Sequence, residues 1–208
     1  MTQQLRYPLI GDQIPQRGNK HSRLFWSTLL ELKGWKVTGE LPNVPKAVVI
    51  AAPHTSNQDG YMGVGVIMAL GLDLHIMIKD AIYRPPFRKF LDWIRMIPVD
   101  RKAANGLVGQ MCDVFNSHEK MWVAIAPEGT RDAADSWKSG FYRIAHAAGV
   151  PIVMFGYDYD HKEAKFLGRF DPSGDFEADL PKIMAFYTET SPAIPERLSQ
   201  PMRALLQR

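Results

Sequence analysis

The 208-residue sequence contains a single cysteine, Cys112. One thiol excludes an intrachain disulfide and any cysteine-rich metal site, which suits a reducing compartment. The chain also lacks an apolar stretch of the roughly 18 to 20 residues needed to cross a bilayer, and residues 1–4 are too polar to begin a signal peptide. We therefore expect a cytoplasmic protein that rests peripherally on the inner face of the membrane.

A strong excess of charge is also missing. The formal net charge is +3, which is too small to argue for a nucleic-acid partner, and we predict none. With 46% hydrophobic and 23% charged residues, the composition is that of an ordinary globular protein, without internal repeats. No linker separates two domains, so we predict one domain over 1–208. We divide it into an irregular N-terminal segment with an amphipathic helix (1–45), a motif-bearing core (46–156) and a C-terminal completion (157–208).

The hydrophobic pattern alternates between strand-like and helix-like segments. Short apolar runs predict strands at 35–39, 47–52, 74–79, 121–126 and 150–155. Helical spacing predicts helices at 21–33, 60–70, 105–117, 139–148 and 178–188, and the stretch 157–170 suits a hairpin that turns near 160–162. This order is typical of an α/β domain with a mainly parallel central sheet flanked by helices. Beyond Ser191 the proline-rich tail is loosely specified.

Three of the predicted segments carry a more specific expectation. The run 47–52 is apolar without alternation, so we expect that strand to be buried on both faces. Glycines at 60, 63 and 65 weaken the following helix, which predicts that its backbone packs closely on a neighbour. Cys112 lies on the apolar stripe of the helix at 105–117, so we interpret its thiol as core filling.

Two aromatic and basic segments leave a choice open. The helix at 21–33, with Ser22 as a possible cap, places Leu24, Phe25, Leu29 and Leu32 at helical spacing. Its apolar face either packs on the core or, with basic neighbours, contacts a membrane. The segment 83–96 interleaves arginine and lysine with aromatic residues. It suits a solvated helix, a surface among anionic headgroups or a docking site for an acidic carrier protein.

A histidine and an aspartate follow the strand at 47–52. Ligands of open α/β sheets collect beyond the carboxyl ends of the strands, and His54 and Asp59 stand at such a place. If His54 is in the loop and Asp59 in the first helical turn, the carboxylate can fix the imidazole tautomer and make the other ring nitrogen a general base. Alternatively, Ser56 is only a helix N-cap and Asp59 only complements the helix dipole.

A second polar loop follows the strand at 121–126. Glu128, Gly129, Thr130 and Arg131 come after this strand as His54 comes after its own, so in a parallel sheet both loops open on one edge. Glycine permits a tight turn, while the threonine hydroxyl and the arginine guanidinium are donors suited to a phosphate. A third charged pair, Asp100 and Arg101, follows the short apolar run 97–99; it could equally be a surface ion pair.

Four motifs in this order resemble those of the glycerolipid acyltransferases typified by 1-acylglycerol-3-phosphate acyltransferase. The residues are HTSNQD at 54–59, RMIPVDR at 95–101, PEGTR at 127–131 and VPIV at 150–153. The resemblance covers residues 48–155. It is specific because four individually weak motifs occur in sequence with suitable gaps. The sequence departs from the pattern at Pro53, at Ala126 and at Arg95, where the family usually has glycine.

The resemblance implies a reaction and a site. In this family the histidine deprotonates an acceptor hydroxyl, which attacks the thioester of acyl-CoA or an acyl carrier protein, so His54 and Asp59 would be catalytic. The acceptor, a lysophospholipid such as 1-acylglycerol-3-phosphate, would be held by Arg101 and by residues 128–131. Lys138 is a further candidate for phosphate contact, or else only an exposed lysine. No cofactor and no metal are expected, since the acyl thioester is a co-substrate.

Other functions remain open on the sequence alone. The acceptor could be another lipid or alcohol, such as an aminolipid, because an arginine at 101 would bind any suitable anion. The chain could also be a peripheral lipid-binding module without turnover, although the full PEGTR motif argues against it. Direct attack by the acceptor agrees with the sequence, which has no Gly-x-Ser-x-Gly elbow and no His-Glu-x-x-His motif. The apolar side of the helix at 60–70 is a candidate acyl groove.

Overall fold

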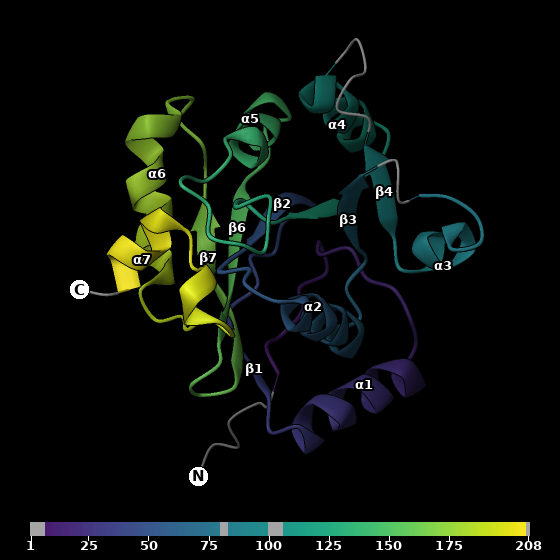
Figure 1. The fold of residues 1–208 in the computed structure, drawn as a ribbon. Coiled ribbons are helices and arrows are strands. Elements are labelled where there is room, and N and C mark those ends of the chain that lie inside the picture. The colour runs from purple at the N-terminus through teal and green to yellow at the C-terminus, as the bar shows by residue number, and fades with distance from the viewer. Residues whose placement is uncertain (1–6, 80–82, 100–105, 207–208) are drawn as a thin grey trace.

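One seven-stranded sheet organises the chain in the computed structural model, which describes residues 7–79, 83–99 and 106–206. The strand order is β1-β7-β6-β2-β5-β3-β4 (Figure 1). The strands are β1 (Lys36–Gly39), β2 (Lys46–Ala51), β3 (Leu74–Lys79), β4 (Met96–Val99), β5 (Met121–Ile125), β6 (Ile152–Asp158) and β7 (Glu163–Phe170). All neighbours pair in parallel except β6 and β7, which form the expected hairpin. The predicted α/β class is confirmed; the internal boundaries at 45 and 156 stay a prediction.

Helices cover both faces of the sheet (Figure 1). They are α1 (Lys20–Leu32), α2 (Asn57–Leu70), α3 (Arg88–Trp93), α4 (Gly106–Asn116), α5 (Gly140–Ala147), α6 (Phe176–Met184) and α7 (Gln200–Leu206), with short 3-10 turns at Ala185–Tyr187 and Pro195–Arg197. β2 lies between two hydrophobic clusters, to which its residues contribute alternately. Val48 and Ile50 join the cluster under α4, α5 and α6, whereas Ala47 and Val49 join the one under α1 and α2. The expected burial of this strand on both faces is confirmed.

Close packing of α2 on its neighbours, α1 and β6, explains two of the three helical glycines. A Cβ added at Gly65 would lie 3.3 Å from Cδ2 of Leu30 on α1, and one at Gly63 would lie 2.8 Å from the hydroxyl of Tyr157. Gly60 faces open space, so the expectation of close packing holds for Gly63 and Gly65 only.

The ends of α1 and of the chain differ from the sequence predictions. The N-cap of α1 is Asn19, whose side chain accepts a hydrogen bond from the backbone of Ser22, so Ser22 is not the cap. The tail beyond Ser191 is not loose, because Met202 of α7 is fully buried in the cluster under α5 and α6. The backbone N–H of Ile194 also donates to the hydroxyl of Thr55 at 3.2 Å. The C-terminal segment is thus fastened to the loop after β2.

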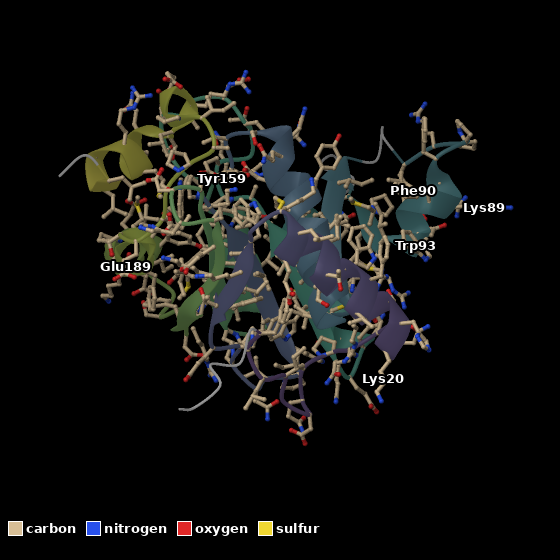
Figure 2. All side chains as sticks on the ribbon, turned by 90° about the horizontal axis from the view of Figure 1, so that it is seen from below. Lys20, Lys89, Phe90, Trp93, Tyr159 and Glu189 are labelled. Carbon is tan, nitrogen blue, oxygen red and sulfur yellow. The ribbon has the colours of Figure 1, made fainter. Side chains whose placement is uncertain are left out.

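Several large apolar side chains lie on the surface of α1, α2 and α3. The buried residue of α1 is Leu30, not Leu24 or Phe25, which are both exposed, because the Leu30 side chain faces α2. Figure 2 shows Phe90 and Trp93 of α3 together with Lys89. Among the described helices, none is long and apolar enough to cross a membrane. The exposed set is Leu9, Leu24, Phe25, Leu32, Tyr61, Phe87, Phe90 and Trp93.

Candidate active site

The register of two adjacent parallel strands brings the two polar loops together. Ile50 of β2 pairs with Ile125 of β5, so the loops that begin a residue or two later leave the sheet at the same edge. The backbone N–H of His54 in the first loop donates to Oε1 of Glu128 in the second, at 3.3 Å. The prediction that both loops open on one edge is confirmed.

His54 lies against Asp59. Nδ1 of His54 is 3.6 Å from Oδ2 of Asp59, and the side chains are 17% and 0% exposed. This separation is slightly long for a hydrogen bond, as is common in sites without bound substrate. Five residues apart, the pair meets because His54 is in the loop while Asp59 is the third residue of α2. Both requirements for an oriented base are therefore present.

Asp59 is held by the backbone that it caps. Ser56 is the N-cap of α2 in a capping box, in which the Asp59 side chain reaches back to the N-cap backbone. Oδ2 of Asp59 accepts hydrogen bonds from the backbone N–H groups of Thr55 at 2.7 Å and Ser56 at 2.8 Å. Capping and orientation of His54 are thus compatible functions of one carboxylate, and the choice posed by the sequence does not have to be made.

Two tyrosines that the motif reasoning missed also contact Asp59. The hydroxyl of Tyr159 donates to Oδ1 at 2.5 Å, and that of Tyr157 donates to the backbone carbonyl of the same residue at 2.7 Å. Both lie at the carboxyl end of β6, which pairs in parallel with β2. A signal was available: two tyrosines at strand spacing, just after the VPIV segment, must reach the same sheet edge as His54.

The pKa of His54 is lowered. Burial of the imidazole is the main cause, the nearby Asp59 carboxylate opposes it, and the positive charge of Arg131 adds to the lowering. A lower pKa keeps the imidazole neutral near pH 7, which is the form that accepts a proton. The positive charge of Arg131 thus acts on the imidazole from the second loop.

Glu128 is a buried carboxyl, only 3% exposed. Burial raises its pKa to about 7, and the bond from the His54 backbone acts in the opposite direction. Its second oxygen, Oε2, has no hydrogen-bond partner among the described residues. The contact that the structure gives Glu128 is with the loop that carries His54; its expected part in holding a headgroup stays a prediction.

The tip of the second loop is exposed. Gly129 has φ +68°, a left-handed conformation that glycine adopts without strain, and its N–H donates to the carbonyl of Ala126. Thr130 and Arg131 follow on the surface. Lys138 is exposed as well, and its backbone N–H donates to the carbonyl of Pro127. Among the described residues, the side chains of Thr130, Arg131 and Lys138 have no acceptor for their donor groups, which face the solvent.

Arg101 lies outside the described residues, so its expected role in binding the acceptor stays a prediction. Arg95, six residues earlier, precedes β4 and is therefore at the opposite edge of the sheet from His54. It has φ +61°, and its Nε donates to Asp73 at 2.9 Å. The position thus has the left-handed conformation that suits glycine, and the charge of Arg95 is paired with Asp73 away from His54.

Cys112 of α4 is partly buried rather than part of the core, whose residues on this helix are Met111 and Phe115. Burial raises the pKa of the thiol, which disfavours a nucleophilic thiolate. Within the ranges that the structure describes, no group of three or more histidine, cysteine or acidic side chains is placed to hold a metal ion.

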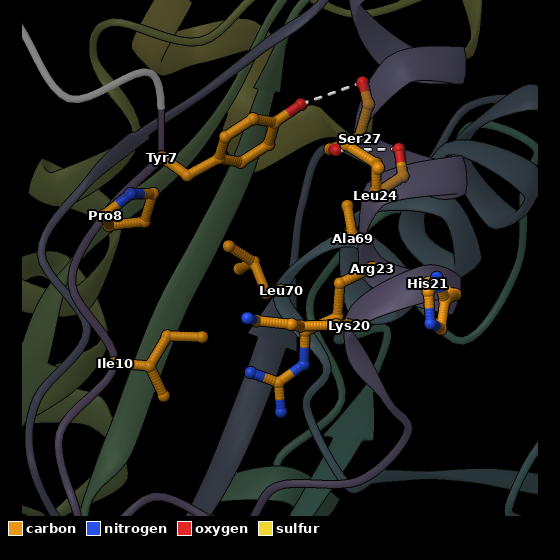
Figure 3. A pocket seen from close by; sticks show the side chains of 10 residues that line it. All are labelled: Tyr7, Pro8, Ile10, Lys20, His21, Arg23, Leu24, Ser27, Ala69 and Leu70. Atoms are coloured by element: carbon orange, nitrogen blue, oxygen red, sulfur yellow. Dashed lines mark hydrogen bonds between the residues drawn. The ribbon is translucent and has the colours of Figure 1, made fainter.

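A cavity of about 540 Å³ lies away from this site, between the N-terminal segment and α1 (Figure 3). It reaches Ala69 and Leu70 at the end of α2, whereas His54 precedes the start of that helix. A helix of 14 residues spans roughly 21 Å, so the cavity is not part of the candidate active site.

Two comparisons with known proteins bear on the family and the fold. A family model described as Acyltransferase matches residues 35–158. Among solved structures, the 1-acyl-sn-glycerophosphate (LPA) acyltransferase PlsC from Thermotoga maritima is similar, with a TM-score of 0.54 and 18% identity over 78% of this chain and 73% of that one. At this identity the likeness shows the fold alone. A comparison with curated proteins gives no match.

Proposed function

The chain belongs to the Acyltransferase family, and from that premise we propose that it moves a fatty acyl group from a thioester to the hydroxyl of a lysophospholipid, with His54 as the general base. The observation that carries the proposal is the pair of partly buried His54 and buried Asp59, which meet across 3.6 Å beside the exposed cationic loop. The thioester is acyl-CoA or an acyl carrier protein. These features support the proposal in place of a lipid-binding module, which needs no oriented base.

The steps follow from the two nitrogens of the imidazole. Nδ1 faces Asp59, which leaves Nε2 to accept the proton of the acceptor hydroxyl. The oxygen attacks the thioester carbonyl, an ester bond forms, and the carbon–sulfur bond breaks. The thiolate leaves with the proton that the imidazolium held, which restores neutral His54. Asp59 stabilises the imidazolium while it exists.

The second loop is proposed to hold the acceptor's phosphate. Thr130 and Arg131 are exposed at its tip. Lys138 lies beside Gly129, because its Cγ atom would be 3.5 Å from a Cβ added to that glycine. Hydroxyl, guanidinium and ammonium donors together suit a phosphate more than a neutral headgroup. Glu128 serves by supporting His54, and Arg101 completes the set. The acceptor class is also that named for the similar PlsC structure.

The acyl chain is proposed to lie along α2. Tyr61, Val64 and Met68 recur at helical spacing on the side of α2 that the core does not cover, since Tyr61 is exposed and the other two are half-buried. This stripe begins two residues after Asp59, so a chain in transfer could extend from the thioester carbonyl over apolar side chains.

The exposed aromatic side chains are proposed to rest on the inner face of the membrane. Trp93 and Phe90 of α3 project beside Arg88 and Lys89, and the guanidinium of Arg17 lies 6.0 Å from the Trp93 ring. Aromatic and basic side chains in one surface suit anionic headgroups.

Sedimentation with anionic vesicles tests this surface. The fraction of protein that sediments should fall for the double variant Phe90→Ser, Trp93→Ser and not for Glu119→Gln. Equal vesicle binding by the double variant and the wild type would show that Phe90 and Trp93 do not contact the membrane.

Thiol release tests the proposed reaction. Purified protein is mixed with acyl-CoA and a panel of lysophospholipids, aminolipids and simple alcohols, and free thiol is measured. We expect release that depends on a phosphorylated acceptor and falls by about 1,000-fold in His54→Ala. Equal release by the variant would contradict a base at His54. Release with an aminolipid alone would move the acceptor to another class, and no release with any acceptor would favour a binding module.

A further inference from the structure

Tyr159, the residue directly after β6, donates a hydrogen bond to the Asp59 carboxylate. Its hydroxyl donates to Oδ1 at 2.5 Å, while the backbone N–H groups of Thr55 and Ser56 occupy Oδ2. The Ser56 hydroxyl also donates to Oδ1, at a longer 3.3 Å. The strongest restraint on Oδ1 therefore comes from the turn after β6, 100 residues away in the sequence.

The Tyr159 ring is itself fixed. It packs edge-on against the Trp35 ring, with centroids 5.0 Å apart and planes at 85°, and its backbone N–H donates to the carbonyl of Ser191. Burial and the bond to Asp59 raise the pKa of the Tyr159 phenol, so the hydroxyl remains protonated and acts as a donor. A rigid ring with a permanent donor can set the orientation of a carboxylate.

We infer that Tyr159 is a positioning residue for acyl transfer: its hydroxyl holds Oδ1 of Asp59 so that Oδ2 faces Nδ1 of His54. The inference rests on the proposed function for its catalytic consequence, but the geometry can be tested without turnover. Without Tyr159, the carboxylate keeps its backbone donors yet gains freedom to turn about its last side-chain bond. This turning leaves the negative charge beside the imidazole but no longer holds the His54 ring in one orientation.

The groups around His54 determine the sign of the electrostatic effect. Asp59 faces it from α2, and Glu128 and Arg131 face it from the loop after β5. A hydroxyl that donates to Asp59 withdraws part of the negative charge that Oδ2 offers to the imidazolium. Removing this hydroxyl strengthens the attraction between Asp59 and protonated His54, so the pKa of His54 should rise.

The experiment compares the wild-type chain with Tyr159→Phe by NMR titration of the His54 ring protons, which are assigned by their loss in His54→Gln. Tyr142→Phe is the matched control, because it removes a phenol bond to another buried carboxylate, Asp179, at 2.7 Å between α5 and α6. We expect a higher His54 pKa in Tyr159→Phe and no change in Tyr142→Phe. An unchanged His54 pKa, or an equal shift in both variants, would overturn the inference.

Turnover supplies the second readout. In the thiol-release assay, kcat of Tyr159→Phe should fall on the order of 10-fold, with KM for the acceptor changed less than twofold, since supporting partners of a site typically contribute this much. A rise in KM alone would overturn the positioning role. If the wild-type chain shows no turnover but the His54 pKa moves as expected, the acyl-transfer proposal fails while the placement of Asp59 by Tyr159 stands.

Discussion

The loops after β2 and β5 meet at one edge of the sheet but are built in opposite ways. In the first, Asp59 is fully buried and its two side-chain oxygens accept bonds from two backbone N–H groups and two hydroxyls. In the second, Glu128 is buried but Thr130 and Arg131 are exposed. The first arrangement fixes a base in one orientation, and the second leaves donors free for a ligand. In the proposed function, the first loop serves the chemistry and the second serves recognition of the acceptor.

Among the residues that support His54, Asp59→Asn should have the largest effect. An amide places an NH₂ group where an oxygen now accepts bonds, so the orientation of His54 is lost. We expect kcat/KM to fall about 100-fold and the free energy of unfolding to fall by about 1–3 kcal/mol. Asp179→Asn is the control, because Asp179 is also buried and bonded to a tyrosine. If both variants lose stability but neither loses activity, Asp59 is only a helix cap.

Glu128→Gln tests the contact between the two loops, in which Glu128 accepts a hydrogen bond from the backbone of His54. Because burial raises the pKa of Glu128 to about 7, the folded chain binds more protons than the unfolded chain between pH 4.5 and 7, and stability falls as the pH rises through this window. Glutamine keeps an acceptor for the His54 N–H without the charge. It should therefore stabilise the chain at pH 8 by up to about 3 kcal/mol and much less at pH 4.5.

Urea unfolding at the two pH values measures this difference, with exposed Glu119→Gln as the control. A gain of equal size at pH 4.5 and pH 8 would show that the charge of Glu128 is not its cause.

Arg131→Ala tests recognition by the second loop. Loss of one guanidinium should raise KM for a phosphorylated acceptor by about 10-fold, since a charge-assisted hydrogen bond contributes roughly 1.5–3 kcal/mol. KM for an uncharged alcohol should change less than twofold. The pKa of His54 should rise, because the Arg131 charge lowers it. The control is Arg143→Ala, at an exposed position on α5, which should change neither quantity. Equal increases in KM for both acceptors would show that Arg131 does not bind the phosphate.

The smallest effect concerns the opposite edge of the sheet. Arg95 and Gly129 share the left-handed conformation, with φ +61° and +68°, but only glycine adopts it without strain. Arg95→Gly should stabilise the chain by about 1 kcal/mol, because the exposed pair with Asp73 contributes little in return. Arg95→Ala keeps the strain and loses the pair, so it should not stabilise. Denaturant unfolding compares them, and a loss of stability in both would show that the ion pair dominates.

The sequence allowed the class of fold and the main pair of the site to be predicted, because both depend on local patterns. Continuous apolar runs identified β2 and β5, and polar residues after each run placed His54 and Glu128 at one edge. The N-cap residue was readable at Ser56, where the capping box is local. It was misassigned at Ser22, since Asn19 provides an equally good cap three residues earlier.

Contacts between distant segments were not predictable in the same way. Tyr159 meets Asp59, and Ile194 meets Thr55, only after the sheet order is known. The prediction of a loosely specified tail was wrong because it rested on the prolines, whereas Met202 is fully buried in the folded chain. The burial of Glu128 and its bond to the backbone of His54 also depend on three-dimensional packing, so neither could be predicted from the motif.

The pH dependence of kcat/KM tests the central claim most directly. A neutral His54 of lowered pKa should give a rising limb with its midpoint below 6.5, the ordinary value for histidine. The residual activity of His54→Ala should lack this limb. A wild-type midpoint at or above 6.5, or the same limb in His54→Ala, would contradict the assignment of His54 as the base.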